Sequence, residues 1–138
     1  MNRVFIDASF WVVYREEKEA RWAQAQRLVM EMCRQQVLFV TTLPVICEIH
    51  ATFSRNPLKR AMVLGDFYKN PLVTIEEVSH RDQLAALGLL SLHKDKTYSL
   101  CDVISFTIMH RLEITRAVSF DRHFRQFGGF DILPEKIS

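Results

Sequence analysis

The stretch Val4-Phe5-Ile6-Asp7-Ala8-Ser9 decides how the rest of the chain is interpreted. Three apolar, β-prone residues are followed at once by an aspartate and two small residues, which is the pattern of a buried strand that ends at a polar turn. The same pattern recurs at residues 117–120, an apolar run closed by Asp121. We therefore expect two buried strands, each followed by an acid at its carboxyl end.

Between and beyond these two runs, helical and strand patterns alternate. Thr42, Ser79 and Ser99 stand where helix N-caps are expected, and Asp82 completes a capping box with Ser79. The patterns predict helices at 16–36, 45–53, from Pro57 to about 69, 84–92, 100–111 and through Phe127, and further strands at 37–41, 72–78 and 130–133. Such alternation predicts βαβ units and an α/β fold with a mainly parallel sheet covered on both faces.

Length and composition restrict the class of protein. A chain of 138 residues with 49% hydrophobic and 25% charged residues suits one globular domain over residues 1–138. An acid at position 7 and no spanning apolar run predict a cytoplasmic protein without a membrane partner. Cys33, Cys47 and Cys101 form an odd set without a CxxC pair, so we expect small buried residues rather than disulfides or a zinc site.

Four acids indicate a metal site. Asp7 and Asp121 should project from the same edge of the sheet, where ligands bind in open α/β folds. Glu48 and Asp102 lie in largely apolar helical segments. Carboxylates that share a site repel one another unless a cation intervenes, and oxygen ligands select hard ions such as Mg²⁺ or Mn²⁺. Such ions activate water for phosphodiester hydrolysis.

Each acid also has a structural interpretation. Asp7 is equally suited to capping a turn, Asp102 to closing a capping box with Ser99, and Asp121 to capping the helix that follows it. Glu48 alternatively lies on a solvated helix face. The four acids taken together favour a functional site over four separate structural roles.

Four segments, in this order, resemble the PIN-domain family and especially its VapC-like toxin branch. They are Val-Phe-Ile-Asp7-Ala-Ser9, Val-Ile-Cys-Glu48-Ile-His, Ser99-Leu-Cys-Asp102-Val-Ile-Ser and Val-Ser119-Phe-Asp121-Arg-His-Phe. The resemblance covers essentially the whole chain. It implies a three-layer α/β/α sandwich and a Mg²⁺- or Mn²⁺-dependent endoribonuclease, the toxin of a type II toxin-antitoxin pair.

The resemblance also assigns roles to residues. Asp7, Glu48, Asp102 and Asp121 match the family's catalytic, metal-binding acids. Ser9 and Ser119 match hydroxyl positions that orient a neighbouring carboxylate or water, although simple turn or cap serines remain an alternative. Cys101 departs from the threonine common in these toxins and weakens a supporting hydrogen bond without removing a ligand. The branch further implies a cognate antitoxin as partner.

Substrate contacts are expected near the fourth acid. Arg122, His123 and Arg125 follow Asp121 and are placed to meet RNA phosphates, with solvated surface charge as the alternative. The net charge of only +2 means that any nucleic-acid contact is local. His123 is left outside the catalytic set because water at the metal can also protonate the leaving oxygen.

One aromatic residue and one apolar helix surface offer further contacts with partners. Trp11 is the one aromatic residue considered for base stacking, and the helix surface around Met62 and Phe67 suggests a homodimer. A catalytically silent RNA-binding or protein-interaction module is the alternative function, but it is expected to lose at least one acid. A phosphatase with a phosphate-accepting aspartate needs a second aspartate where Ser9 stands.

Overall fold

A single parallel sheet forms the centre of the protein, whose computed structural model describes residues 2–135. Five strands run in the order β3-β2-β1-β4-β5. Every neighbouring pair is parallel, which confirms the predicted sheet. The strands are β1 (Arg3–Ile6), β2 (Leu38–Thr42), β3 (Val73–Glu76), β4 (Arg116–Val118) and β5 (Asp131–Leu133).

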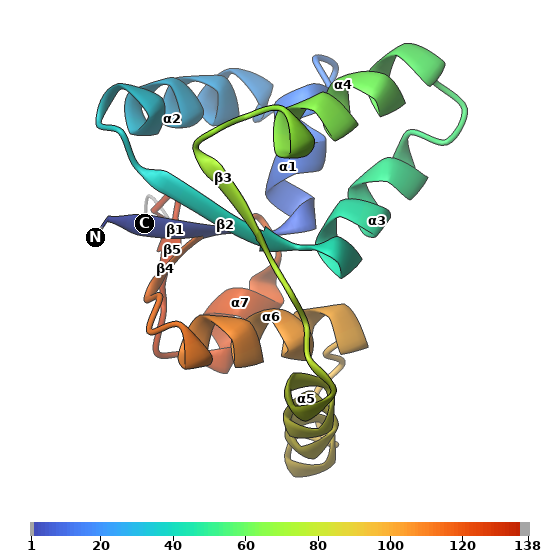
Figure 1. The fold of residues 1–138 in the computed structure, drawn as a ribbon, viewed down its shortest axis with the longest axis vertical. Coiled ribbons are helices and arrows are strands. Elements are labelled where there is room, and N and C mark those ends of the chain that lie inside the picture. Colours follow the sequence, from blue (N-terminus) through green and yellow to red (C-terminus); the bar gives the residue numbers. More distant parts are fainter. Residues whose placement is uncertain (1, 136–138) are drawn as a thin grey trace.

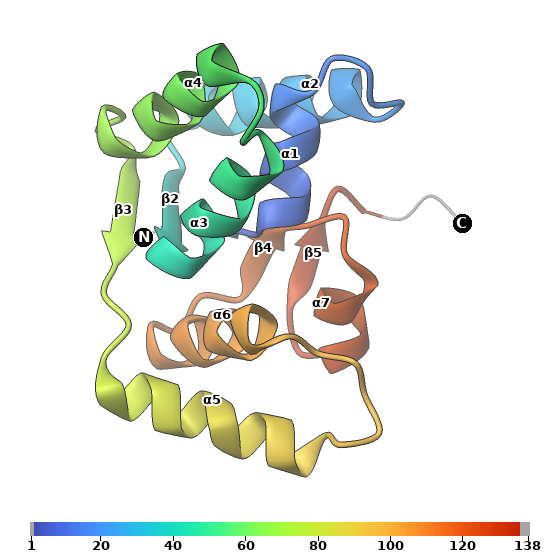
Figure 2. The same cartoon turned by 90° about the vertical axis from the view of Figure 1, so that its right-hand side faces the viewer.

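Helices cover both faces of this sheet. Figures 1 and 2 show α1 to α4 on one side and α5 to α7 on the other, so the predicted α/β/α sandwich is confirmed. The helices are α1 (Ala8–Arg15), α2 (Trp22–Arg34), α3 (Leu43–Thr52), α4 (Pro57–Tyr68), α5 (His80–Leu92), α6 (Leu100–Arg111) and α7 (Arg122–Phe127). Among the described residues, no helix is long and apolar enough to cross a membrane.

The strand order reverses beside β1. From β1 the chain builds outward through β2 to β3, and it then returns to the other side of β1 to add β4 and β5. Phe5 pairs with Val40 on one side and with Ala117 on the other. The carboxyl ends of β1 and β4 therefore meet at the point where ligands bind in open parallel sheets.

Local signals explain most helix starts. Ser79 and Ser99 both form complete capping boxes, with Asp82 and Asp102 as the acidic members. Thr42 occupies the predicted N-cap position of α3, but its side chain makes no capping bond. Instead, its hydroxyl is buried without a hydrogen-bond partner among the described residues.

The predicted helix over residues 16–36 is wrong at its beginning. A separate helix, α1, begins directly after Asp7, and residues 16–21 form turns before α2 starts at Trp22. The short segment Asp7-Ala8-Ser9 suggested a turn, but Phe10 and Trp11, which follow it directly, are buried. Tertiary burial of these aromatic side chains decides the local structure.

Three expectations about exposure also need correction. Trp11 is buried, and its indole Nε1 donates to Asp66 Oδ2 at 2.9 Å, so it offers no face for base stacking. Phe67 is only 2% exposed and belongs to the core, so of the two residues named for the dimer surface only Met62 is exposed. Cys47 is exposed and Cys33 and Cys101 are partly exposed, so none of the three is a fully buried residue.

Candidate active site

All four predicted acids line one pocket of about 420 Å³ at the carboxyl ends of β1 and β4. The pocket lies where α1 and α3 of one layer face α6 of the other (Figure 2). Its lining residues are Asp7, Ala8, Ser9, Val12, Glu48, Thr52, Ser99, Asp102, Asp121 and His123. Acids that are far apart in the sequence are thus brought together by the parallel topology.

Asp7 lies at the floor of the pocket and is 4% exposed. Its Oδ2 accepts hydrogen bonds from Ser9 Oγ at 2.5 Å and from Ser119 Oγ at 2.7 Å. Burial raises the pKa of Asp7 to about 6 against the lowering effect of the two serines, and the charges of Asp102 and Asp121 raise it further. Its side chain makes no helix-capping bond, so the turn-cap interpretation of Asp7 is wrong.

The two serines connect the ends of β1 and β4. Ser9 Oγ accepts from the backbone N–H of Phe120 at 3.0 Å while it donates to Asp7. Ser119 Oγ accepts from the backbone N–H of Asp121 at 3.0 Å in the same way. Each hydroxyl therefore donates its proton to Asp7 and orients that carboxylate. The oxygen of the same hydroxyl accepts a backbone N–H and so holds the loop that carries Asp121.

Asp102 combines a structural role with a position in the pocket. Its Oδ2 accepts from the backbone N–H of Ser99 at 3.0 Å, which completes the capping box of α6, and from His123 Nδ1 at 2.7 Å. Within residues 2–135 no hydrogen-bond donor reaches its other oxygen, Oδ1. The capping interpretation is confirmed, and it leaves one carboxylate oxygen available.

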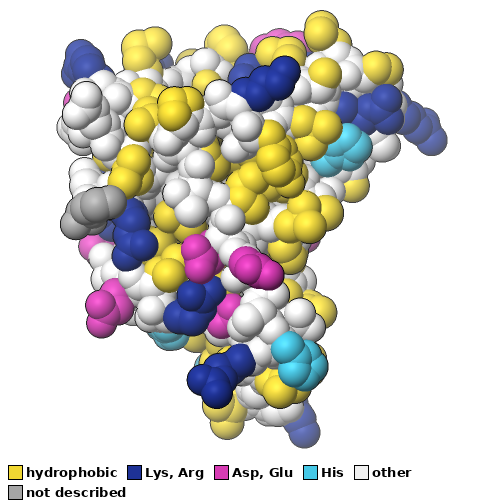
Figure 3. Space-filling model, viewed as in Figure 1, with side chains coloured by type: hydrophobic (Ala, Val, Ile, Leu, Met, Phe, Trp, Pro, Cys, Tyr) yellow, Lys and Arg dark blue, Asp and Glu magenta, His cyan; other side chains and the backbone are white. Residues whose placement is uncertain are grey.

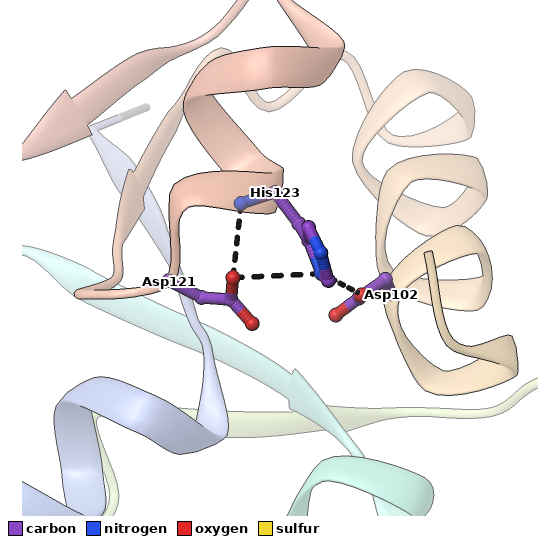
Figure 4. Close-up of side chains that lie close together, drawn as sticks. All are labelled: Asp102, Asp121 and His123. Atoms are coloured by element: carbon purple, nitrogen blue, oxygen red, sulfur yellow. Dashed lines mark hydrogen bonds and ion pairs between the residues drawn. The ribbon is translucent and has the colours of Figure 1, made fainter. Parts of the chain in front are cut away.

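His123 stands between two of the acids (Figure 4). Its Nδ1 lies 2.7 Å from Asp102 Oδ2 and 3.5 Å from Asp121 Oδ1. Its Nε2 lies 3.0 Å from the hydroxyl of Thr97, and its ring meets the edge of Tyr98. A Thr97 hydroxyl that donates to Nε2 leaves the proton on Nδ1, where it is directed at Asp102.

Asp121 sits at the N-terminus of α7 and accepts from the backbone N–H of His123 at 2.9 Å, so its predicted capping role is confirmed as well. Asp102, Asp121 and His123 each present a ligand atom within 4.8 Å of the other two. The sequence predicted His123 as an RNA contact outside the catalytic set, whereas in the structure it lies against two of the acids. The only signal for it was its position two residues after the fourth acid.

Glu48 differs from the other acids because it is exposed on α3. The expectation of apolar surroundings is wrong for this residue, because its apolar neighbours in sequence point to the other side of the helix. Partial desolvation and the nearby Asp102 charge raise the pKa of Glu48. Burial and the same Glu48 raise the pKa of the Cys101 thiol, which therefore stays neutral.

The residues present fit a hard divalent cation. Within the described part of the chain, no Lys or Arg nitrogen lies within 4.0 Å of any of the four carboxylates. The pKa of Asp7 is raised mainly by burial, and the nearby charges of Asp102 and Asp121 raise it further. Carboxylate oxygens around an open pocket are the donors that Mg²⁺ and Mn²⁺ prefer.

The predicted substrate-contact residues separate into two groups. His123 lines the acid pocket, whereas Arg122 and Arg125 line a neighbouring hollow. Arg122 is exposed, and Arg125 donates from Nη2 to the backbone oxygen of Pro134 at 2.6 Å. Both arginines lie on α7, one and four residues after Asp121.

Comparisons with known proteins agree with this geometry. The model of the PIN domain matches residues 4–129. A Mycobacterium tuberculosis protein, 23S rRNA-specific endonuclease VapC20, is 28% identical over 133 residues, which are 96% of this chain and 99% of that protein, and its copy in a second strain gives the same values. The crystal structure of M. tuberculosis VapC20, described as a Sarcin-Ricin loop cleaving toxin, has a TM-score of 0.85 at 25% identity and covers 95% of this chain and 99% of that one.

Proposed function

This chain belongs to the PIN-domain family, and on that basis we propose that it is a metal-dependent endoribonuclease and the toxin of a type II toxin-antitoxin pair. The observation that carries the proposal is the meeting of four carboxylates in one pocket at the switch point of a PIN-type sheet. The similarity to VapC20 along nearly the whole chain supports an RNA substrate.

Asp7, Glu48, Asp102 and Asp121 are the residues that would hold Mg²⁺ or Mn²⁺. Such an ion, when bound, makes water reactive towards the phosphodiester and stabilises charge on the departing oxygen. The chain itself contributes the placement of the ligands. Asp7 offers the oxygen that the serines leave free, and Asp102 offers Oδ1, because Oδ2 is held by Ser99 and His123.

The supporting residues fix these acids before any substrate arrives. Ser9 and Ser119 hold Asp7 and the loop before Asp121 in one arrangement. His123 holds Asp102 from the opposite side and is itself held by Thr97. Ligands that are already oriented need little reorganisation when the reaction develops charge.

The RNA is proposed to be structured ribosomal RNA. VapC20 is named for 23S rRNA and for the Sarcin-Ricin loop, and the present chain shares its fold along 95% of its length. Arg122, His123 and Arg125 stand beside the pocket and are proposed to contact the phosphates of the strand. We place this activity in the cytoplasm, where ribosomal RNA is found.

Protein partners are proposed to be a cognate antitoxin and a second copy of the chain. An apolar groove of about 610 Å³ runs between α3, the end of β3 and α5, and Figure 3 shows hydrophobic side chains gathered on that face. An apolar groove can take the apolar face of a partner's amphipathic helix. Its apolar members are Leu43, Pro44, Tyr68, Ile75, Val78, Leu87, Leu100 and Ile104.

The test is cleavage of mixed-sequence RNA and of ribosomal RNA with and without Mn²⁺. Asp7→Asn and Asp102→Asn are expected to lose cleavage, because each removes a carboxylate from the pocket. Asp131→Asn is the matched control, since Asp131 is exposed and begins β5. It therefore lies at the amino ends of the strands, away from the carboxyl ends that form the pocket. Metal-dependent cleavage that survives both pocket substitutions would contradict the site.

The silent RNA-binding or protein-interaction module remains the alternative function. It predicts that the wild type binds RNA and cleaves none under any metal. The retention of all four acids around one pocket supports the enzyme instead, because a module without chemistry has no need for unneutralised carboxylates.

A further inference from the structure

We propose that Arg21, Arg122 and the ring of Phe120 form a phosphate-binding subsite that holds the RNA strand beside the acid pocket. The inference rests on the proposed ribonuclease function and adds to it a place for the part of the strand that is not cut. It differs from the acid pocket in position and in charge.

The subsite is a hollow of about 310 Å³ next to the acid pocket. Three arginines line it, and the only carboxylate among its lining residues is that of Glu135. The lining residues are Arg21, Gln24, Phe120, Arg122, Arg125, Pro134 and Glu135. Three positive charges against one negative charge make the hollow a local anion site on a protein whose net charge is only +2.

Arg21 is held in place by an aromatic ring and not by an acid. Its Cζ lies 4.0 Å from the ring centroid of Phe120. The other partner of that ring is Phe10, which stacks on it with a centroid distance of 5.2 Å and an interplanar angle of 19°. A guanidinium that lies on a ring keeps the N–H groups of its edge free to bind a phosphate.

Neither of the exposed arginines is neutralised. Within residues 2–135, no carboxylate oxygen lies within 4.0 Å of a nitrogen of Arg21 or Arg122, although other arginines of the chain, such as Arg15 and Arg111, are paired with acids. Arg125 is already used as a donor to Pro134 and supports the wall of the hollow. Arg21 and Arg122 are therefore the main donors to a ligand, and Arg125 adds the N–H groups that Pro134 leaves free.

Phe120 and Asp121 join the two cavities. The ring of Phe120 lines the arginine hollow, and the carboxylate of the next residue, Asp121, lines the acid pocket. The backbone N–H of Phe120 is fixed by Ser9 Oγ at 3.0 Å, and Ser9 also holds Asp7. A strand whose phosphodiester lies at the acids thus places a neighbouring phosphate at the arginines.

The chemistry of the hollow favours a nucleic-acid phosphate over an acidic peptide. A planar guanidinium group can donate two parallel hydrogen bonds to two oxygens of one phosphate. Arg21 and Arg122 stand next to the site that is proposed to cut a phosphodiester. A strand that enters the acid pocket alone would meet only like charges. The arginines supply the attraction that the acids lack.

Binding is measured by fluorescence anisotropy with a labelled single-stranded RNA, in EDTA so that no cleavage occurs, over a series of salt concentrations. The variants are Arg21→Gln, Arg122→Gln and the double substitution. Arg27→Gln is the matched control, because Arg27 is exposed on the same helix, α2, as Gln24 but does not line the hollow.

Each lost phosphate contact should reduce the slope of log K against log salt by about 0.7 and weaken binding roughly fivefold at 0.1 M salt. The double variant should lose about twice that slope, and Arg27→Gln should match the wild type. In the presence of Mn²⁺, KM for RNA should rise in the variants while kcat is largely kept. Mn²⁺ affinity and Tm should stay unchanged, which confirms that the variants are folded.

An unchanged salt slope and affinity in the double variant would overturn the subsite, even if the wild type cleaves RNA. Equal loss of binding for poly-glutamate and for RNA would overturn the RNA assignment in favour of an acidic protein partner. Failure of the wild type to cleave any RNA would contradict the proposed function. Because binding is measured in EDTA without cleavage, the test of the subsite would still stand by itself.

Discussion

Asp7→Asn should make the metal-free protein more stable at neutral pH. Within residues 2–135, two serine hydroxyls are the donors to the buried Asp7 carboxylate, whose pKa is raised from the ordinary value of 3.8 to about 6. Folding therefore favours the protonated acid. At pH 7 or above, the folded protein must hold a charged group that the unfolded chain holds at no cost.

The size of the effect follows from the shift in pKa. A difference of about 2 pKa units at 1.36 kcal/mol per unit corresponds to a cost of about 3 kcal/mol for the charged Asp7. The cost is absent below pH 3.8, grows as the pH rises towards 6, and is complete above it. An asparagine side chain has nearly the same shape as aspartate and accepts the serine hydrogen bonds without carrying a charge. The Tm of the Asp7→Asn variant above pH 7 should therefore exceed that of the wild type by roughly 10 °C.

The assay is thermal unfolding by circular dichroism in EDTA at pH 4 and pH 8. The expected gain for Asp7→Asn appears at pH 8 and disappears at pH 4, and Asp131→Asn shows no such dependence on pH. Added Mn²⁺ should stabilise the wild type and leave Asp7→Asn almost unaffected. A variant that is less stable than the wild type at pH 8 would refute the argument that the buried charge is uncompensated.

Three further results are expected from single substitutions. His123→Asn should weaken Mn²⁺ binding by about tenfold in isothermal titration calorimetry, because Asp102 loses the group that orients it, and unchanged affinity would exclude that role. Ser119→Ala should raise the pKa of Asp7 further, so that the midpoint of Mn²⁺ binding against pH moves upward; a midpoint that stays in place would contradict the network. Asp82→Ala should cost about 2 kcal/mol in urea unfolding, since it removes the capping box of α5 and a charge-assisted bond to α6, and Mn²⁺ affinity should not change.

Much of the fold was predictable because its signals are local. The apolar run before Asp7 and the capping serines at positions 79 and 99 specify a strand end and two helix starts through a few neighbouring residues. The beginning of α1 was not predictable in this way. It depends on the burial of Phe10 and Trp11 and on a hydrogen bond from Trp11 to Asp66. Asp66 lies on α4, which follows more than 40 residues later.

The same division applies to the site. Asp7 and Asp121 could be placed at one edge of the sheet because each follows a short apolar strand. These strands, β1 and β4, are parallel neighbours where the strand order reverses. The position of His123 could not be foreseen, since it requires α7 to turn its first residues towards α6 and the loop at Thr97 to meet the ring. The exposure of Glu48 likewise depends on which side of α3 packs on the core.

The central claim is that the four acids hold the divalent ion on which RNA cleavage depends. The most direct measurement is an anomalous difference map from a crystal soaked in Mn²⁺. The account predicts a peak in the pocket lined by Asp7, Asp102 and Asp121, within coordination distance of Asp102 Oδ1, and its loss in Asp102→Asn. A peak elsewhere in a protein that still cleaves RNA, or a peak in this pocket that persists without Asp102, would contradict it.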